Sequence, residues 1–329
     1  MDKTEQIERT FSMPDGCQLD VHNVSGSIVV TGGEGDQVHI VAVKRSRRWQ
    51  EAEATEIDIG QEGRRVWART RVHRRKDWRR LWGGGAASVD YAIELPRQSQ
   101  VKVSSISAST DVSSMEGQVT IHSVSGSVLA RHIHGPLHIE SVSASVSGHA
   151  LQGQLRLETV SGKVDLAESD FNSLRTITVS GPLKIATSLH PAGEYRAQTV
   201  SGNVELLLPA TSNCTVEGHS VSGRLRTSLA HSPQRQRFGT WRIEVGHGGV
   251  PLRFDSVSGD LILTVVGERA AVQAAGGEAS EVAAQAEPEV TPTTMGILRA
   301  IEMGQLSVEE GLAKLRQVKE GTEAQHGKQ

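Results

Sequence analysis

The residues with the most obvious binding chemistry lie between positions 44 and 82, where thirteen Lys or Arg residues accompany only six Asp or Glu residues. Four of the five tryptophans of the chain fall in this stretch. Guanidinium groups bind phosphates and carboxylates, while Trp favours membrane interfaces and stacks on unpaired bases. The candidate residues for binding an anionic surface are Arg64, Arg65, Trp67, Arg69, Arg71, Arg74, Arg75, Lys76, Trp78, Arg79, Arg80 and Trp82.

Several interpretations of this basic–aromatic stretch remain open from the sequence. It fits a long surface hairpin whose Arg stems cover Trp rings, or whose charges pair with acidic residues elsewhere in the chain. It also fits contact with an anionic membrane surface. Single-stranded nucleic acid is a disfavoured alternative, and an acidic protein partner is the remaining one.

Acid–base chemistry has one candidate set. His122, Glu140 and Glu158 are eighteen residues apart and would stack about 5 Å apart if each repeat forms one layer. A His beside two carboxylates suits metal binding or proton transfer, and adjacent like charges would raise one Glu pKa. The same column continues as Ile177 and Gln198, which favours a solvated polar face.

A second set surrounds the expected corner at residues 135–136. His132 and His134 alternate along one expected strand and His138 follows nearby, so two zinc ligands are geometrically feasible. No Cys or carboxylate accompanies them locally, which favours a coincidence of surface residues. We therefore predict no catalytic, cofactor-binding or metal-binding residues, and no enzyme.

A repeated pattern must position all these side chains. The pattern is [Ser/Thr]-Val-Ser-Gly, with a weaker copy at Ile106, and the steps from Ile106 onward are 18, 18, 18, 19, 21, 21 and 36 residues. A fixed period near 20 is typical of a solenoid. The Val of the pattern lies at Val24, Val124, Val142, Val160, Val179, Val200, Val221 and Val257.

Apolar residues alternate with polar ones before and after each copy, which indicates short half-buried strands joined by tight bends. An 18-residue repeat is too short to include a crossover helix. We predict an all-β fold: a right-handed parallel β-solenoid (β-helix) with rungs of about 18–21 residues. The repeated Val is expected inside, and Ser or Thr outside as hydroxyl ladders. The final 36-residue step is expected to hold a degenerate rung or a loop.

The chain is expected to divide into five parts. These are a β-rich part at 1–100 with the basic–aromatic hairpin 44–82, solenoid repeats at 101–267, an acidic Ala/Glu/Gly/Pro linker at 268–292, a small C-terminal α-helical hairpin at 293–321 and a tail at 322–329. The spacing of Ser307 and Glu310 predicts a capping box in the hairpin. Two such short helices cannot bury much surface alone. The candidate partner-binding residues of the hairpin are Ile297, Leu298, Ile301, Leu306, Leu312 and Leu315.

Composition gives limited information on location. The net charge is −3, and no run of 18 apolar residues occurs, so we expect no transmembrane segment. Cys17 and Cys214 are expected to be free thiols. The polar N-terminus predicts no signal peptide, and hence a cytoplasmic or membrane-peripheral protein.

The repeats resemble a bacterial family of β-strand-repeat proteins named as putative adhesins, long classed as a domain of unknown function. The resemblance covers about residues 11–267 and includes Phe11, Leu19-Asp20-Val21, the strand Tyr91 to Pro96 and the Val-Ser-Gly copies. The tail from Ile297 to Gly311 is similar to a helical hairpin attached to such proteins. The resemblance implies a β-solenoid fold and suggests a link to the cell envelope or stress.

Together these features predict a non-enzymatic scaffold or interaction protein, peripheral to an anionic membrane surface. Its expected partners are proteins, or further copies of the chain, bound through the solenoid ends or the helical tail. The alternatives are a carbohydrate-active β-helix enzyme, a carbohydrate-binding adhesin, and a regulatory partner acting through the tail. No cofactor is expected.

Overall fold

The computed structural model describes residues 3–46, 48–73, 86–232, 235–237 and 239–266. This part of the chain is all-β with one short helix, which confirms the predicted all-β class. The predicted linker, helical hairpin and tail lie outside the described residues. Among the described residues, no helix has the length and apolar character needed to span a membrane.

The N-terminal elements are β1 (Lys3–Ser12), β2 (Gln18–Gly33), β3 (Gln37–Ser46), α1 (Trp49–Ala54), β4 (Thr55–Glu62), β5 (Arg65–Val72) and β6 (Ser88–Pro96). The repeats form β7 (Gln100–Met115), β8 (Val119–Ser123), β9 (Ser127–His134), β10 (Leu137–Ser141), β11 (Ser145–Thr159), β12 (Val164–Thr178), β13 (Leu183–Thr187), β14 (Glu194–Thr199) and β15 (Val204–Leu208). The last elements are β16 (Cys214–Ser220), β17 (Leu225–Thr227), β18 (Arg235–Arg237), β19 (Thr240–Val245), β20 (Val250–Ser256) and β21 (Leu261–Val265).

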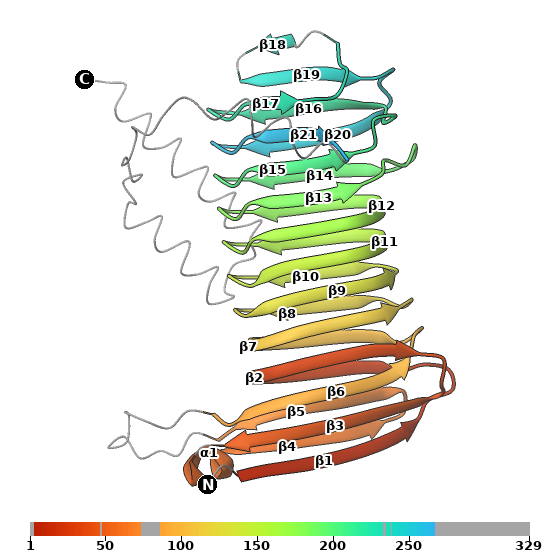
Figure 1. The fold of residues 1–329 in the computed structure, drawn as a ribbon, viewed down its shortest axis with the longest axis vertical. Helices are drawn as coiled ribbons and strands as arrows, with labels where there is room; N and C mark the ends of the chain where they lie inside the picture. The colour runs from red at the N-terminus through yellow and green to blue at the C-terminus, as the bar shows by residue number, and fades with distance from the viewer. Residues whose placement is uncertain (1–2, 47, 74–85, 233–234, 238, 267–329) are drawn as a thin grey trace, which may run out of the picture.

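The repeats stack in a solenoid-like way, as a ladder of strands (Figure 1). Equivalent residues of successive repeats pair in parallel, so that Val101 lies beside Val119, Val119 beside Leu137 and Leu137 beside Leu155. A second set of parallel pairs includes β7–β9, β9–β11 and β11–β12. Each repeat contributes strands to both sets, and the apolar side chains that alternate along them are buried together in one core.

The predicted orientation of the repeat motif is wrong. The Ser or Thr before each Val is buried, as at Ser123, whereas Val124 is 40% exposed and Ile106 is 42% exposed. The reason is strand alternation: Val119 and Ile121 point inward, so the next inward position is Ser123, and Val124 falls outside.

The Gly of the motif is required by close stacking of the backbone. A Cβ on Gly162 would lie 2.0 Å from the carbonyl oxygen of Ala144 in the neighbouring repeat, and one on Gly181 would lie 2.1 Å from the carbonyl oxygen of Gly162. Side chains at these positions would therefore push the layers apart.

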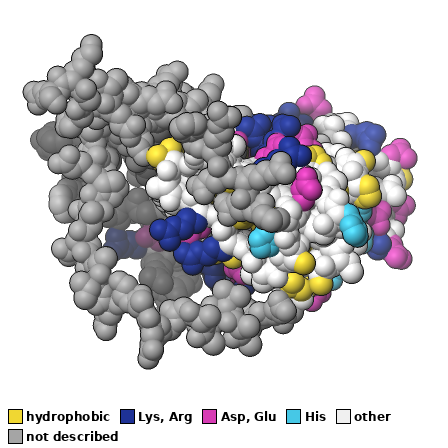
Figure 2. Space-filling view, turned by 90° about the horizontal axis from the view of Figure 1, so that it is seen from above, with side chains coloured by type: hydrophobic (Ala, Val, Ile, Leu, Met, Phe, Trp, Pro, Cys, Tyr) yellow, Lys and Arg dark blue, Asp and Glu magenta, His cyan; other side chains and the backbone are white. Residues whose placement is uncertain are grey.

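The 36-residue step holds neither a degenerate rung nor a simple loop. The strands β20 and β21 lie between two earlier layers: β20 pairs with β14 and β16, and β21 pairs with β15 and β17. The residues between β17 and β20 form antiparallel β18 and β19, with β19 antiparallel to β16. Seen from this end, the described surface carries mixed basic, acidic and histidine side chains with few hydrophobic ones (Figure 2).

The N-terminal end has a related arrangement and departs from a uniform parallel solenoid. The strands β5 and β6 pair in parallel with β2, and their outer neighbours β4 and β3 pair with them in antiparallel fashion. The strand β1 adds to β3. This end positions the basic–aromatic residues identified in the sequence.

Candidate interaction surfaces

The β4–β5 hairpin presents the described part of the basic–aromatic stretch. Strand alternation buries Val66, Ala68 and Thr70, so Arg65 and Trp67 fall on the opposite side of β5 together with residues 69 and 71. The hairpin turns at Gly63, whose positive φ of 56° is readily adopted by glycine. The core side of β5 therefore fixes which side chains face outward.

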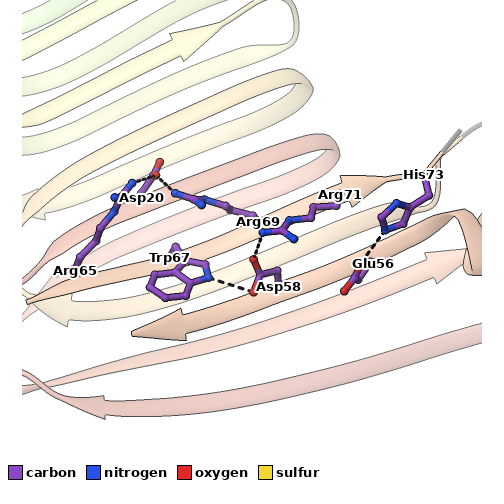
Figure 3. A network of polar contacts seen from close by, with 8 residues as sticks. All are labelled: Asp20, Glu56, Asp58, Arg65, Trp67, Arg69, Arg71 and His73. Atoms are coloured by element: carbon purple, nitrogen blue, oxygen red, sulfur yellow. Dashed lines mark hydrogen bonds and ion pairs between the residues drawn. The ribbon is translucent and has the colours of Figure 1, made fainter. Parts of the chain in front are cut away.

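The outward arginines bind carboxylates of neighbouring strands (Figure 3). Asp20 accepts hydrogen bonds from Arg69 at 2.5 Å and Arg65 at 3.2 Å. Burial acts to raise the pKa of Asp20, but the hydrogen bonds from Arg69 and Arg65 outweigh it and hold that pKa below its usual value. Arg71 pairs with Asp58 at 2.7 Å. These contacts order the arginine side chains.

Asp58, which pairs with Arg71, also orients the side chain of Trp67. The Nε1 of Trp67 donates to Asp58 at 3.2 Å, and the Arg69 guanidinium lies 5.9 Å from the centre of the indole ring. The indole also covers Gly60, where a Cβ would lie 2.4 Å from it. The cation–π arrangement considered for the sequence is therefore present at Trp67.

Positive and negative charges are nearly balanced around this hairpin. Arg64 donates to the backbone oxygens of Asp15 at 2.6 Å and Gly16 at 3.4 Å, which are neutral acceptors. Arg65 and Arg69 share Asp20. On the hairpin, four arginines (64, 65, 69 and 71) accompany Glu56, Asp58 and Glu62, so its formal net charge is +1, and Asp20 of β2 balances that charge.

The other candidate residues of this stretch, Arg74, Arg75, Lys76, Trp78, Arg79, Arg80 and Trp82, lie outside the described residues, as do Ile297, Leu298, Ile301, Leu306, Leu312 and Leu315. The described residues on either side of segment 74–85 are held by hydrogen bonds. The amide of His73 donates to the oxygen of Ala54 at 2.8 Å, and the amide of Ala87 donates to Thr55 Oγ1 at 3.0 Å. Both ends of segment 74–85 therefore attach beside the start of β4.

An open hollow of about 310 Å³ adjoins this network and shares Asp20 and Arg65 with it. Three glutamines contribute amide groups to its lining, and a cation and a hydroxyl are added by Lys102 and Thr120. Its glutamines are Gln18, Gln100 and Gln118. Sequence reasoning missed this hollow, although the repeat register places two of the glutamines eighteen residues apart.

The structure brings together part of the predicted His–Glu column. His122 Nδ1 lies 2.9 Å from Glu140, but Glu158 bonds to Arg156 at 2.6 Å instead. His138, which the sequence places with His132 and His134, lies 3.2 Å from Glu140. Burial is the main cause that lowers the pKa of His138. Its position two residues before Glu140 on one strand was the signal that could have found this contact.

The three histidines around residue 135 do not converge. His132 and His134 belong to β9 and His138 to β10, in different sets of paired strands. His132 meets His149 instead, edge to face at 6.1 Å between ring centres. In the part of the chain that the structure describes, no group of three His, Cys, Asp or Glu side chains could hold a metal ion.

A Ser, Asp and His also meet at one surface position that the sequence did not reveal. The Ser188 hydroxyl donates to Asp170, and His190 Nε2 lies 2.9 Å from the same carboxylate. The hydrogen bond from Ser188 is the main cause that lowers the pKa of Asp170. Since the carboxylate lies between Ser and His, the imidazole is not placed to take the serine proton, as a nucleophile–base pair requires.

The Val residues of the motif, together with Ile106, follow one another from layer to layer at one corner of the stack, most of them at least partly exposed and Val179 buried. Backbone hydrogen bonds join successive corners: the amide of Val124 donates to Ser105 and that of Ser143 donates to Val124. We call this line the Val column. It comprises, in spatial order, Val24, Ile106, Val124, Val142, Val160, Val179, Val200, Val257 and Val221.

The fold and these surfaces define an all-β, solenoid-like protein with charged and apolar lines along its length. The chain belongs to the Toastrack DUF4097 family, whose model matches residues 17–264. Among curated proteins, the chain has no match.

Solved structures of bacterial proteins show low similarity. One is described as a putative cell adhesion protein from Clostridium sporogenes, with 9% identity, a TM-score of 0.25, and coverage of 79% of this chain and 100% of that chain. A putative adhesin from Parabacteroides merdae has 11% identity, a TM-score of 0.38, and coverage of 80% and 96%. A putative lipid binding protein from Parabacteroides distasonis has 9% identity, a TM-score of 0.38, and coverage of 79% and 96%.

Proposed function

We propose that this chain is a non-enzymatic scaffold, a right-handed β-solenoid that acts in the cytoplasm and contacts an anionic membrane surface through its basic N-terminal end. The C-terminal helical hairpin at 293–321 completes the proposed architecture. The observation that carries the proposal is the excess of basic over acidic residues in the stretch 44–82, thirteen against six, which includes the β4–β5 hairpin.

The charge of the molecule is unevenly distributed. The whole chain has a net charge of −3, while residues 44–73 carry eight basic and five acidic residues, a formal charge of +3. In sequence, residues 74–82 add five basic residues, one aspartate and two tryptophans. Basic residues near an anionic leaflet are each worth about 1 kcal/mol, and Trp favours the interface. This end should therefore bind anionic lipid despite the acidic total charge.

Co-sedimentation of the full chain with liposomes tests the proposal. Phosphatidylserine-containing vesicles should bind the protein at low salt, neutral phosphatidylcholine vesicles should not, and high salt should weaken binding. Trp78→Ala/Trp82→Ala and Arg65→Gln/Arg69→Gln should both reduce binding. The matched control is Arg224→Gln/Arg226→Gln, which removes two positive charges next to and within β17, at the other end of the stack. Equal binding to both vesicle types, or an equal loss in the control, would contradict a membrane contact at the hairpin.

The polar hollow favours a second candidate function, binding of a saccharide. Glutamine amides both donate and accept hydrogen bonds, and Thr120 adds a hydroxyl, which matches a ligand rich in hydroxyl groups. Titration with a bacterial glycan mixture, comparing the natural chain with Gln100→Ala, tests this alternative. Binding that Gln100→Ala leaves intact would exclude the hollow as the saccharide site.

A further inference from the structure

The Val column is exposed at Ile106, Val124 and Val221, buried at Val179 and half-buried at its other positions. Its end residue Val221 is 65% exposed, while Val179 in the middle is 8% exposed. Nine layers spaced about 4.8 Å apart make a line of roughly 38 Å. Scattered apolar residues are normal on a protein surface, whereas a contiguous apolar line indicates a contact surface.

The backbone along this column has few hydrogen-bonding groups to offer. Amides at the corners donate to the preceding layer, as Val160 does to Ser141 and Ser161 does to Val142. The neighbouring serine hydroxyls are also engaged, since Ser143 Oγ donates to the oxygen of Val124 at 3.2 Å. A partner that adds as a β-strand would find no free ladder here. The column therefore suits a partner that brings apolar side chains, such as one face of a helix.

The chain itself carries such a partner. Residues 293–321 have the sequence pattern of two short amphipathic helices, with Ile297, Ile301, Leu312 and Leu315 among their apolar positions. Helices of this length are marginal in water without a surface on which to bury their apolar side. A partly exposed apolar column and a segment whose sequence predicts amphipathic helices therefore occur in one molecule.

The segment can reach the column. The described chain ends at Val266, nine residues after Val257, so at most about 30 Å separates it from the column. The 26 residues from 267 to 292 are rich in Ala, Gly and Glu, and a coil of that length spans about 26–31 Å on average. We propose that residues 293–321 dock on the Val column of the same chain, over the layers from Val257 toward Val160. This inference is independent of the membrane contact.

Thiol labelling of the full chain tests the proposal. The natural thiols give little background because Cys17 and Cys214 are buried, and burial raises the pKa of both, that of Cys214 to about 11. The reporter is Ser161→Cys, an exposed position beside Val160. The control reporter is Gln98→Cys, an exposed position in the turn between β6 and β7.

Each reporter is labelled with a maleimide dye in the natural background and with Leu298→Ser/Leu312→Ser/Leu315→Ser. If the segment is docked four-fifths of the time, these substitutions should speed labelling at Ser161→Cys about fivefold and leave Gln98→Cys unchanged. Equal rates at Ser161→Cys in both backgrounds would overturn the proposal. Protection that grows with protein concentration would also overturn it, because a second copy would then be the occupant. Both labelling results are independent of whether the β4–β5 hairpin binds liposomes.

Discussion

The hydroxyl oxygens of Ser105 and Ser123 lie 3.1 Å apart in the core, although they are 18 residues apart in the chain. Both side chains are 4% exposed. The hydroxyl of Ser123 also donates to the backbone oxygen of its near neighbour Ser125 at 3.1 Å. A column of buried hydroxyls of this kind joins the layers through their interior rather than along their surface. The repeated Ser or Thr is thus a core residue.

The first prediction concerns this column. Ser123→Ala should lower the free energy of unfolding by about 1–3 kcal/mol, because it leaves the buried hydroxyl of Ser105 without its acceptor. Ser143→Ala removes an exposed hydroxyl from the same motif and should change stability by less than about 0.5 kcal/mol. Urea unfolding followed by far-ultraviolet circular dichroism gives both values. Equal effects would contradict a structural role for the buried column.

The second prediction concerns the glycine of the motif. Gly162→Ala should destabilise the chain by roughly 1–3 kcal/mol, since the new Cβ would lie 2.0 Å from the backbone oxygen of Ala144. Gly35→Ala is the matched control, because a Cβ there meets nothing within 4 Å. The control should be neutral or stabilising by about 0.4–1 kcal/mol. Thermal unfolding of the two variants is the measurement, and a tolerant Gly162 would mean that the layers can separate at this corner.

The third prediction separates the packing role of the hairpin network from its electrostatic role. Asp20→Asn removes the carboxylate that Arg65 and Arg69 share, so stability should fall by about 1–2 kcal/mol. The same substitution makes the hairpin more positive, so binding to anionic vesicles should become stronger. Urea unfolding and liposome co-sedimentation of one preparation measure both effects. A loss of vesicle binding in a folded variant would contradict the electrostatic explanation.

The fourth prediction is a pH dependence. Burial lowers the pKa of His138 below its ordinary value of 6.5, against the opposing effect of Glu140; Arg156 and His122 lower it further and Glu158 raises it. Between that lowered pKa and 6.5 the unfolded chain binds more protons at this site than the folded chain does. The contribution of His138 to stability is therefore complete above pH 6.5 and is lost as pH falls through its folded pKa. His138→Gln should flatten this part of the stability profile between pH 5 and 7.5, and an unchanged profile would exclude His138 as its source.

Much of the fold could be predicted from the sequence because the repeat period and the alternation of apolar residues both report on local geometry. The all-β class and the parallel register of residues such as Val101 and Val119 follow from them. The orientation of the motif was within reach as well. Inward positions at Val119 and Ile121 extend by alternation to Ser123, whereas the polarity of serine taken alone favours an outward position.

The contacts of the candidate sites depended on information that spacing does not contain. The repeat places His122 beside Glu140 and Glu140 beside Glu158, and both neighbours follow from the register. The hydrogen bond between Arg156 and Glu158 joins two side chains of one strand, and the repeat spacing does not specify such a contact. Similarly, Asp20 meets Arg65 and Arg69 only because β5 returns to pair with β2, across a connection that includes β3, α1 and β4.

The order of the last layers in the stack is the feature of the fold that the sequence predicts least well. The last prediction concerns this order. A step of 36 residues is compatible with any arrangement in which one layer is skipped, and the structure inserts β20 between β14 and β16. Arg196 is therefore beside Arg253, which in turn is beside Glu217. A chain that stacked strictly in sequence order would place Arg196 next to Glu217 instead.

Oxidation of paired cysteines distinguishes the two orders. Arg196→Cys/Arg253→Cys places the two Cα atoms about 4.8 Å apart, within the range that a disulfide spans. Arg196→Cys/Glu217→Cys places them two layers apart, about 9.6 Å, which is too far. Mild oxidation followed by mass spectrometry should find a disulfide in the first variant only, since Cys17 and Cys214 are buried. A disulfide in the second variant alone would mean that the layers follow the sequence order. In that case β20 and β21 would form the end of the stack instead of lying between two earlier layers.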